Sequence, residues 1–392
     1  MDVYKAVKQR IERSDHIKLM KTFLLMMNDC LRLTRDLEKP SYTTVKEICY
    51  PLMQEYDVHN SYRISAIYES ANLLKKYRTD LRSGKASPPY CRRLFISASI
   101  GVTVDGGRLV MPDGSSIQLN KHTLSVLKEP GNDLVSATLT PTSLSIIYKR
   151  NVHQVETAGI VALDLNLENV TTWDDEGRTE AYSISELRQL QERYRRVTSR
   201  FRRRDNRIKR EIFRKYAGRK LARRDWVLHE LSSLIVRRAA ALNQTIAMEN
   251  LKGIRKIFRR ESGSSAYYLS MMNAWPFAEL QKQIAYKARW VGLPVVYVEP
   301  EGTSSNCSEC GGALEESSTG DRMMTCTVCG LKIDRDVNGA RRIMSRAVRS
   351  AAAGPTDEAM VGGVSRENGP APKVDAGNPT SQGDWKRGPE HS

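Results

Sequence analysis

Two pairs of cysteines constrain the fold of this chain more than any other feature. Cys307 and Cys310 form one C-x2-C pair, Cys326 and Cys329 form the second, and fifteen residues separate the pairs. This spacing is typical of zinc sites. Four thiolates close a tetrahedral site, so we expect a structural Zn²⁺ rather than a catalytic one. The alternative is two disulfides, which the lack of a secretory signal disfavours.

The charge of the chain indicates a polyanionic partner. Its 392 residues carry a formal net charge of +17, with a pI near 9.6, which favours nucleic acid or an acidic membrane surface. No stretch approaches the ~20 apolar residues of a membrane span. Charges also interrupt the N-terminal residues too often for a signal peptide. We therefore expect an intracellular protein that binds nucleic acid and no membrane.

A dense basic tract lies within a helical stretch from Ser185 to about Leu242. Between Arg188 and Arg224 there are seventeen Lys or Arg residues and three acids. We expect a pair of helices that neutralises phosphates and binds nucleic acid in a steeply salt-dependent way. The alternative is a solvated charged face. The predicted contact residues are Arg195, Arg196, Arg200, Arg202, Arg203, Arg204, Arg207, Lys209, Arg210, Arg214 and Lys215.

Three acidic residues stand where predicted elements end or begin. Asp164 and Glu249 end apolar strands, and Asp336 opens the final helix shortly after the last cysteine. Each alone also fits a simpler role, as a turn residue, a solvated glutamate or a helix N-cap. Their order along the chain, however, is the layout of the ribonuclease H-like fold. Clustered carboxylates of this kind hold hard cations such as Mg²⁺, or Mn²⁺ in its place, for two-metal hydrolysis.

The sequence around these acids resembles the TnpB family of transposon-encoded, RNA-guided nucleases, which are related to compact type V CRISPR effectors. The segments that match the three RuvC motifs of the family are residues 159–172, 246–254 and 334–343. They place Asp164, Glu249 and Asp336 at the catalytic positions, and the third motif selects Asp336 over Asp334. The similarity is clear over about residues 157–347 and only architectural before that. Two departures are Asn166, where the family usually has glycine, and Gly339, which replaces an alanine.

The resemblance implies an α/β nuclease domain preceded by a β module. The module would be a wedge-like β-barrel carrying a helical recognition insert, since strand signals dominate from Arg93 to Tyr148 and helical spacing from His16 to Arg82. The nuclease would be an RNase H-like RuvC domain with an inserted zinc ribbon. The expected bounds are 1–15 and 90–156 for the barrel, 16–89 for the insert, 157–302 and 333–350 for the nuclease domain, 303–332 for the ribbon and 351–392 for a disordered tail.

The resemblance also implies an activity and partners. The protein would be an endodeoxyribonuclease that takes a guide RNA from the transposon end and cuts double-stranded target DNA next to a short motif. It would work in the cytoplasm of a prokaryote, associated with the nucleoid, as a monomer or dimer. All three acids are kept, so we expect an active enzyme. The alternatives are a guide-independent DNA transposase of the same fold and a non-cleaving nucleic-acid-binding regulator.

Overall fold

A computed structural model describes most of the chain. The chain forms two compact units, and the boundary between them follows Asn151. The described residues are 1–12, 15–82, 84, 87–200, 206–251, 275–300, 305–316 and 322–352. For the helical residues 198–200, 206–209, 212 and 351–352, this description covers the backbone alone. Of the tail expected over residues 351–392, residues 351 and 352 belong to the last described helix, and the rest lies outside this range. None of the helices in the described ranges has the length and apolar character to cross a bilayer.

The first unit is built on a four-stranded antiparallel sheet. Its strands run in the order β1 (Asp2–Arg10), β7 (Ser143–Asn151), β6 (Asp133–Thr140) and β2 (Ile96–Ala98). Three helices lie between β1 and β2 in the chain: α1 (Ile17–Thr34), α2 (Tyr42–Met53) and α3 (Asn60–Arg82). These helices confirm the expected helical segment. The barrel stays a prediction, because the pairings between described residues do not join β2 to β1.

One helix of this unit was not predicted from the sequence. A separate three-stranded sheet consists of β3 (Thr103–Asp105), β4 (Arg108–Val110) and β5 (Ser116–Gln118). A short helix, α4 (Lys121–Lys128), then interrupts the run that was expected to contain strands. The side chain of Asn120 caps it by accepting a hydrogen bond from the Thr123 amide at 2.7 Å. An asparagine N-cap was the local signal for this helix.

The second unit contains a five-stranded mixed sheet. Its order is β10 (Thr179–Ser183), β9 (Asn169–Asp174), β8 (Gly159–Leu165), β11 (Gln244–Glu249) and β12 (Val295–Val298). The first three of these strands along the chain, β8 to β10, form an antiparallel meander. Strand β11 then pairs in parallel with β8 on one side and β12 on the other. This is the order expected for the RNase H-like fold, and it places β8 and β11 at the centre.

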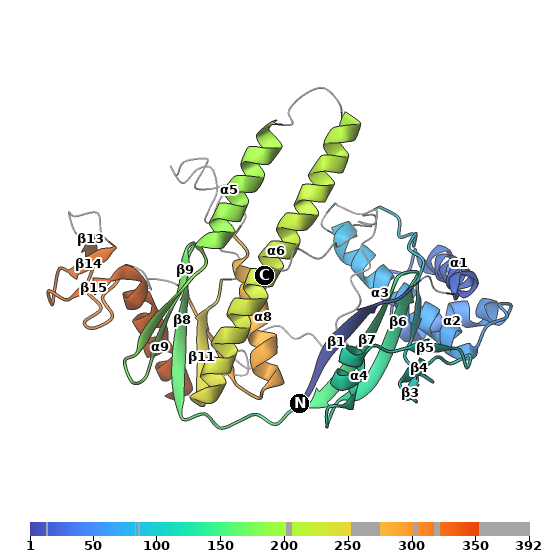
Figure 1. Cartoon of the computed structure of the whole chain (residues 1–392), viewed down its shortest axis with the longest axis horizontal. Coiled ribbons are helices and arrows are strands. Elements are labelled where there is room, and N and C mark those ends of the chain that lie inside the picture. The colour runs from blue at the N-terminus through green and yellow to red at the C-terminus, as the bar shows by residue number, and fades with distance from the viewer. Residues whose placement is uncertain are drawn as a thin grey trace, which may run out of the picture. The chain divides into compact units, whose positions relative to one another are not determined.

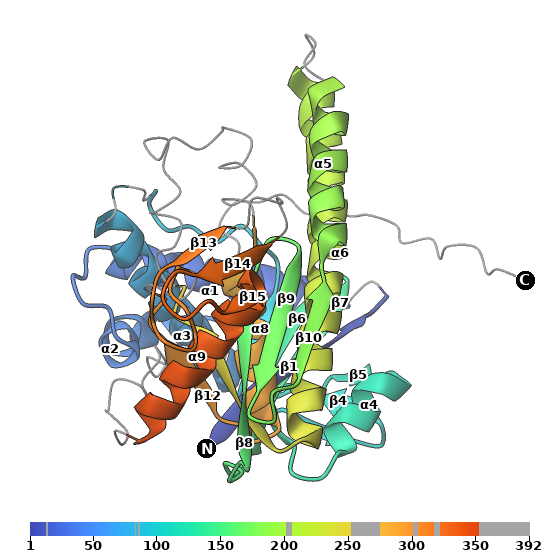
Figure 2. The ribbon, with the colours of Figure 1, turned by 90° about the vertical axis from the view of Figure 1, so that its left-hand side faces the viewer.

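Helices cover both faces of this sheet. Helix α6 (Asn206–Ala241) and α8 (Phe277–Trp290) lie on one face, and α9 (Arg335–Ala352) lies on the other (Figures 1 and 2). Alternation along β11 explains the division, since Ile246 and Met248 pack toward α6 and α8 while Ala247 packs toward α9. Helix α5 (Ser185–Arg200) runs beside the first half of α6, and the two form a hairpin that projects from the sheet (Figure 1).

A small sheet joins the last strand of the nuclease-like unit to its last described helix. It consists of β13 (Leu314–Glu316), β14 (Met323–Cys326) and β15 (Lys332–Asp334). Strand β15 ends at the residue before α9 begins. The cysteine-bearing segment is therefore inserted between β12 and α9, as the sequence predicts.

Candidate active site

The three acids predicted as ligands come from neighbouring elements of the second unit. Asp164 is the penultimate residue of β8 and Glu249 is the last residue of β11. These strands are parallel neighbours, so both acids lie at the same edge of the sheet, directly after the paired residues Leu163 and Met248. Asp336 is the second residue of α9, which packs on β8 and β11. The fold thus brings together residues that lie far apart in the chain.

The electrostatics of Asp164 show that this edge concentrates negative charge. Burial, and then the charges of Glu249 and Asp336, raise the pKa of Asp164 to about 7, against the opposing hydrogen bond from Asn166. Clustered carboxylate oxygens are hard ligands that suit a divalent cation. The carboxylates are still spread apart: within the described part of the chain, only the four cysteines have all their ligand atoms within 4.8 Å of one another. A cation would have to draw the acids closer.

The start of α9 separates the role of Asp334 from that of Asp336. The carboxylate of Asp334 accepts hydrogen bonds from the backbone N–H groups of Asp336 at 2.8 Å and Val337 at 3.2 Å. Asp334 is therefore the N-cap of the helix. Asp336 is therefore not the cap of the helix, and its buried side chain belongs to the acidic cluster.

Amide side chains contact all three acidic positions; the sequence singled out only Asn166 among them, and it revealed none of these contacts. The side-chain amide of Asn166, in the turn after β8, donates to Asp164 Oδ2, and that of Asn169, the first residue of β9, donates to Asp336 Oδ2, both at 3.0 Å. On α8, Gln281 donates to the backbone carbonyl of Glu249 at 2.6 Å. Two asparagines beside the turn that follows an acidic strand end were the available signal. Each amide fixes an oxygen without adding charge.

An ion pair that the sequence did not reveal joins the ribbon to the acids. Arg322, which precedes β14, pairs with Asp336, and the arginine side chain is half exposed while the carboxylate is buried. The backbone also connects the two segments, since the Arg335 amide donates to the Arg322 carbonyl at 2.9 Å. Because Arg322 and a metal ion would neutralise the same carboxylate, a cation binding at Asp336 competes with this arginine.

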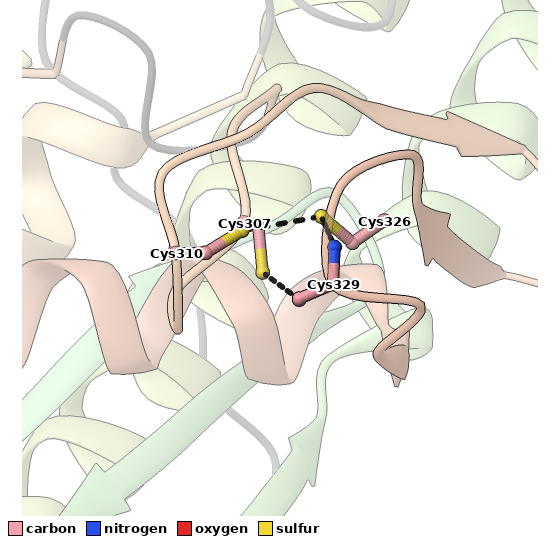
Figure 3. A group of neighbouring side chains, drawn as sticks. All are labelled: Cys307, Cys310, Cys326 and Cys329. Atoms are coloured by element: carbon pink, nitrogen blue, oxygen red, sulfur yellow. Dashed lines mark hydrogen bonds between the residues drawn. The ribbon is translucent and has the colours of Figure 1, made fainter.

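The four cysteines converge as a tetrahedral site requires (Figure 3). The Sγ atoms of Cys307 and Cys329 lie 3.7 Å apart, and those of Cys310 and Cys326 lie 3.4 Å apart. Bound sulfurs at ~2.3 Å from Zn²⁺ in tetrahedral geometry would be roughly 3.8 Å apart, whereas a disulfide needs ~2.05 Å. Backbone N–H groups also point at three of the sulfurs. The cluster therefore fits a metal such as zinc.

Helix α9 holds the first cysteine knuckle through its second and third turns. Asn338 is fully buried, accepts from the Ser308 amide at 2.8 Å and donates to the Asn306 carbonyl at 2.9 Å. Arg342 donates to the carbonyl of Cys307 between them, at 3.0 Å. The cysteine cluster and Asp336 are consequently fixed to the same helix.

Part of the predicted nucleic-acid surface is visible on the α5–α6 hairpin. Arg195, Arg196, Arg210, Arg214 and Lys215 are exposed there. Arg202, Arg203 and Arg204 lie outside the described residues, and Arg200, Arg207 and Lys209 lie in helices without described side chains. Other basic residues serve the hairpin itself. Lys220 donates to Gln191 at 3.0 Å, and Arg223 pairs with Glu186 at 2.6 Å.

Comparisons with known proteins agree with this architecture. A family model described as "Cas12f1-like, TNB domain" matches residues 277–343. The TnpB-like protein MJ0751 of Methanocaldococcus jannaschii is 30% identical over 204 residues, which cover 50% of this chain and 71% of that protein. The chain belongs to the TnpB family.

Other relatives place this TnpB-family protein near compact CRISPR effectors. The CRISPR-associated endodeoxyribonuclease Cas12f1 of Sulfoacidibacillus thermotolerans is 35% identical over 121 residues, 31% of this chain and 26% of that protein. A cryo-EM structure of a Cas12f1–sgRNA–target DNA complex matches with a TM-score of 0.60 and 12% identity, covering 84% of this chain and 83% of that one. The fold is that of a RuvC-containing compact effector.

The raised pKa of Asp164 predicts a pH dependence for this TnpB-family protein. Its carboxyl has a pKa of about 7 instead of the ordinary 3.8. Without a cation, the resulting contribution to the stability of the folded state is fully present below about pH 4 and is lost as the pH rises through about 7. Cations need the deprotonated form. We expect Mn²⁺ affinity to fall by up to about ten-fold per pH unit below 7. Metal titrations at several pH values measure this, and a flat profile between about pH 6 and pH 8 would contradict it.

Proposed function

We propose that this protein is an RNA-guided, divalent-metal-dependent endonuclease that cuts DNA at an Asp164–Glu249–Asp336 site. The observation that carries the proposal is the convergence of these acids at the ends of β8 and β11 and the start of α9, where burial and then the charges of Glu249 and Asp336 raise the pKa of Asp164. The name of the Cas12f1 relative supports DNA cleavage, and the sgRNA and target DNA bound in the structurally similar complex support an RNA guide.

The chain's own residues would prepare the site for in-line hydrolysis. Asp164, Glu249 and Asp336 would hold Mg²⁺ or Mn²⁺, which supply Lewis acidity and activate water by a two-metal mechanism. Asn166 and Asn169 orient two of the carboxylates through single hydrogen bonds. Arg322 pairs with Asp336 and would have to release this carboxylate for a cation to bind there. A structural Zn²⁺ at the four cysteines would keep the ribbon, and with it the start of α9, in place.

The remaining parts of the chain would bind the nucleic acids. The guide RNA, derived from the transposon end, and the target DNA would contact the basic α5–α6 hairpin, since phosphate contacts position a heteroduplex without reading its sequence. The barrel and helical recognition insert, with the bounds expected above, would recognise the short motif beside the target, while base pairing reads the rest.

Co-purification tests this function directly. The protein is expressed beside its native flanking DNA, the bound RNA is sequenced, and a plasmid matching the guide region is incubated with Mg²⁺. We expect one defined RNA and cleavage next to a short motif. Strand-transfer products from transposon ends without RNA would favour the transposase. Tight binding without cleavage in Mg²⁺ or Mn²⁺ would favour the regulator.

The basic hairpin gives a quantitative prediction. Replacing Arg214 and Lys215 together with glutamine removes two exposed charges and should flatten the slope of log affinity against log salt by about 1.4 to 1.8. Filter binding to the co-purified RNA over a salt series measures the slope. The matched control is the exchange Arg214→Lys with Lys215→Arg, which keeps the charge and should keep the slope. An unchanged slope in the glutamine variant would show that these residues do not contact phosphate.

A further inference from the structure

The Asp164 carboxylate lies between two residues that depart from the family's usual pattern. Its Oδ2 atom accepts a hydrogen bond from the Asn166 amide at 3.0 Å. The same carboxylate also lies against Gly339 of α9, where a Cβ atom would be 2.7 Å from Oδ2 and 3.1 Å from Cγ. A real Cβ does not approach another atom that closely. The observed position of the carboxylate therefore requires that residue 339 has no side chain.

The glycine in α9 has no conformational explanation. Glycine weakens a helix more than any residue except proline, so an internal glycine usually has a packing reason. Gly339 is absent from the glycines with positive φ in the described residues, so an alanine would fit its backbone. The missing side chain leaves space for Asp164, and space is the only property of glycine that this position uses.

The asparagine likewise has no backbone reason. Asn166 begins the turn between β8 and β9. Its backbone N–H closes the turn by donating to the Asn169 carbonyl at 2.9 Å. Among the described residues, Asn243 alone combines a side chain with positive φ, so Asn166 adopts an ordinary backbone conformation. What distinguishes residue 166 is its side-chain amide and the oxygen of Asp164 that it holds.

We propose that Asn166 and Gly339 act as a coupled pair of positioning residues: the amide fixes Asp164 Oδ2 in the space that the glycine leaves open. The proposal rests on Asp164 being a cation ligand, as the proposed function has it. An alanine at 339 must push the carboxylate away from α9, and this move is opposed while Asn166 holds it. Without the Asn166 amide, the carboxylate is free to turn aside.

A double-mutant cycle on Mn²⁺ binding tests the pair, read from the EPR signal of free Mn²⁺ with the full-length protein. Gly339→Ala alone should weaken Mn²⁺ binding by about ten-fold, and Asn166→Ala alone should weaken it as well. The double variant should bind about as weakly as Gly339→Ala alone, because both changes displace the same carboxylate, a coupling within the range found for residues in contact. Alanine at 166 removes the amide without adding backbone freedom. Gly218→Ala is the matched control, because Gly218 is a residue of α6 with nothing within 4 Å of the position that a Cβ would take.

The thermal midpoint of the metal-free protein provides a second readout. Gly218→Ala should raise this midpoint, as expected for a helical glycine. Gly339→Ala should lower the midpoint when Asn166 is present. In a protein that already carries Asn166→Ala, the same glycine change should raise the midpoint. Additive effects of the two changes, or wild-type Mn²⁺ binding by Gly339→Ala, would overturn the pair. If Gly339→Ala alone does not fold, adding Asn166→Ala should allow it to fold. A double variant that also stays unfolded would overturn the pair. Mn²⁺ binding that survives Asp164→Asn would instead overturn the metal site of the proposed function.

Discussion

Replacing Asp164 with asparagine is expected to abolish DNA cleavage while leaving guide RNA binding intact. Asparagine keeps the shape of the side chain but removes the charge that the central strand β8 presents to Glu249 and Asp336. Groups that act as one unit lose nearly all their effect when one is removed, so we expect a loss of roughly 10³-fold or more. Plasmid cleavage in Mg²⁺, with RNA binding measured on the same samples, tests this.

The expected change in stability provides a control that does not depend on cleavage. Asp164 is protonated only below about pH 7. At higher pH its charge is repelled by the neighbouring acids in the metal-free wild type, and the asparagine variant removes this repulsion. The variant should therefore have a higher thermal midpoint than the wild type at about pH 8. Glu176→Gln is the matched control, since Glu176 is exposed in the turn at the opposite edge of the sheet. Cleavage by the Asp164 variant at the wild-type rate would refute the proposed site.

Replacing Cys307 with serine is expected to release the metal of the ribbon and to inactivate the nuclease. Cys307 is fully buried, and its flanking residues and its carbonyl are held by Asn338 and Arg342 of α9. A structural zinc site contributes free energy on the order of 10 kcal/mol to folding. Its loss should leave the buried amide of Asn338 without partners and loosen the helix start that carries Asp336.

Three measurements separate the ribbon from the rest of the fold. Metal analysis should show bound zinc lost in Cys307→Ser, hydrogen exchange should rise in β14, β15 and the first turns of α9, and cleavage should fall with them. Cys91→Ser is the control, because Cys91 is a buried thiol of the first unit and is not part of the cluster. It should keep the zinc. A Cys307 variant with normal exchange in α9 and normal cleavage would show that the ribbon does not position Asp336.

The sequence identified those parts of the site that depend on local pattern. The C-x2-C pairs are visible within a few residues, and the acids at the ends of apolar strands became candidates through their order along the chain and the resemblance of the segments around them. The partners of these residues come from other segments. Arg322 reaches Asp336 from the ribbon, and Gln281 reaches the Glu249 carbonyl from α8. Such contacts depend on the three-dimensional fold, which no local pattern encodes.

The departures from the family pattern illustrate the same limit. Asn166 and Gly339 are recognisable in the sequence as unusual, but they are 173 positions apart by their numbers and nothing local connects them. Only the packing of α9 on β8 shows that both face one oxygen of Asp164. Helix α4 was missed for a simpler reason: eight residues after an asparagine cap give too little periodicity to outweigh the strand signals around them.

The position of Asp336 on the last described helix means that the acidic cluster is completed late in synthesis. During synthesis, β8 and β11 emerge first and can pair, but the acidic cluster lacks its third member until the ribbon and α9 have also left the ribosome. A nascent or prematurely terminated chain therefore exposes its basic hairpin before it has a complete site. Under the proposed function, such a fragment would bind nucleic acid through the hairpin but would lack a complete cleavage site.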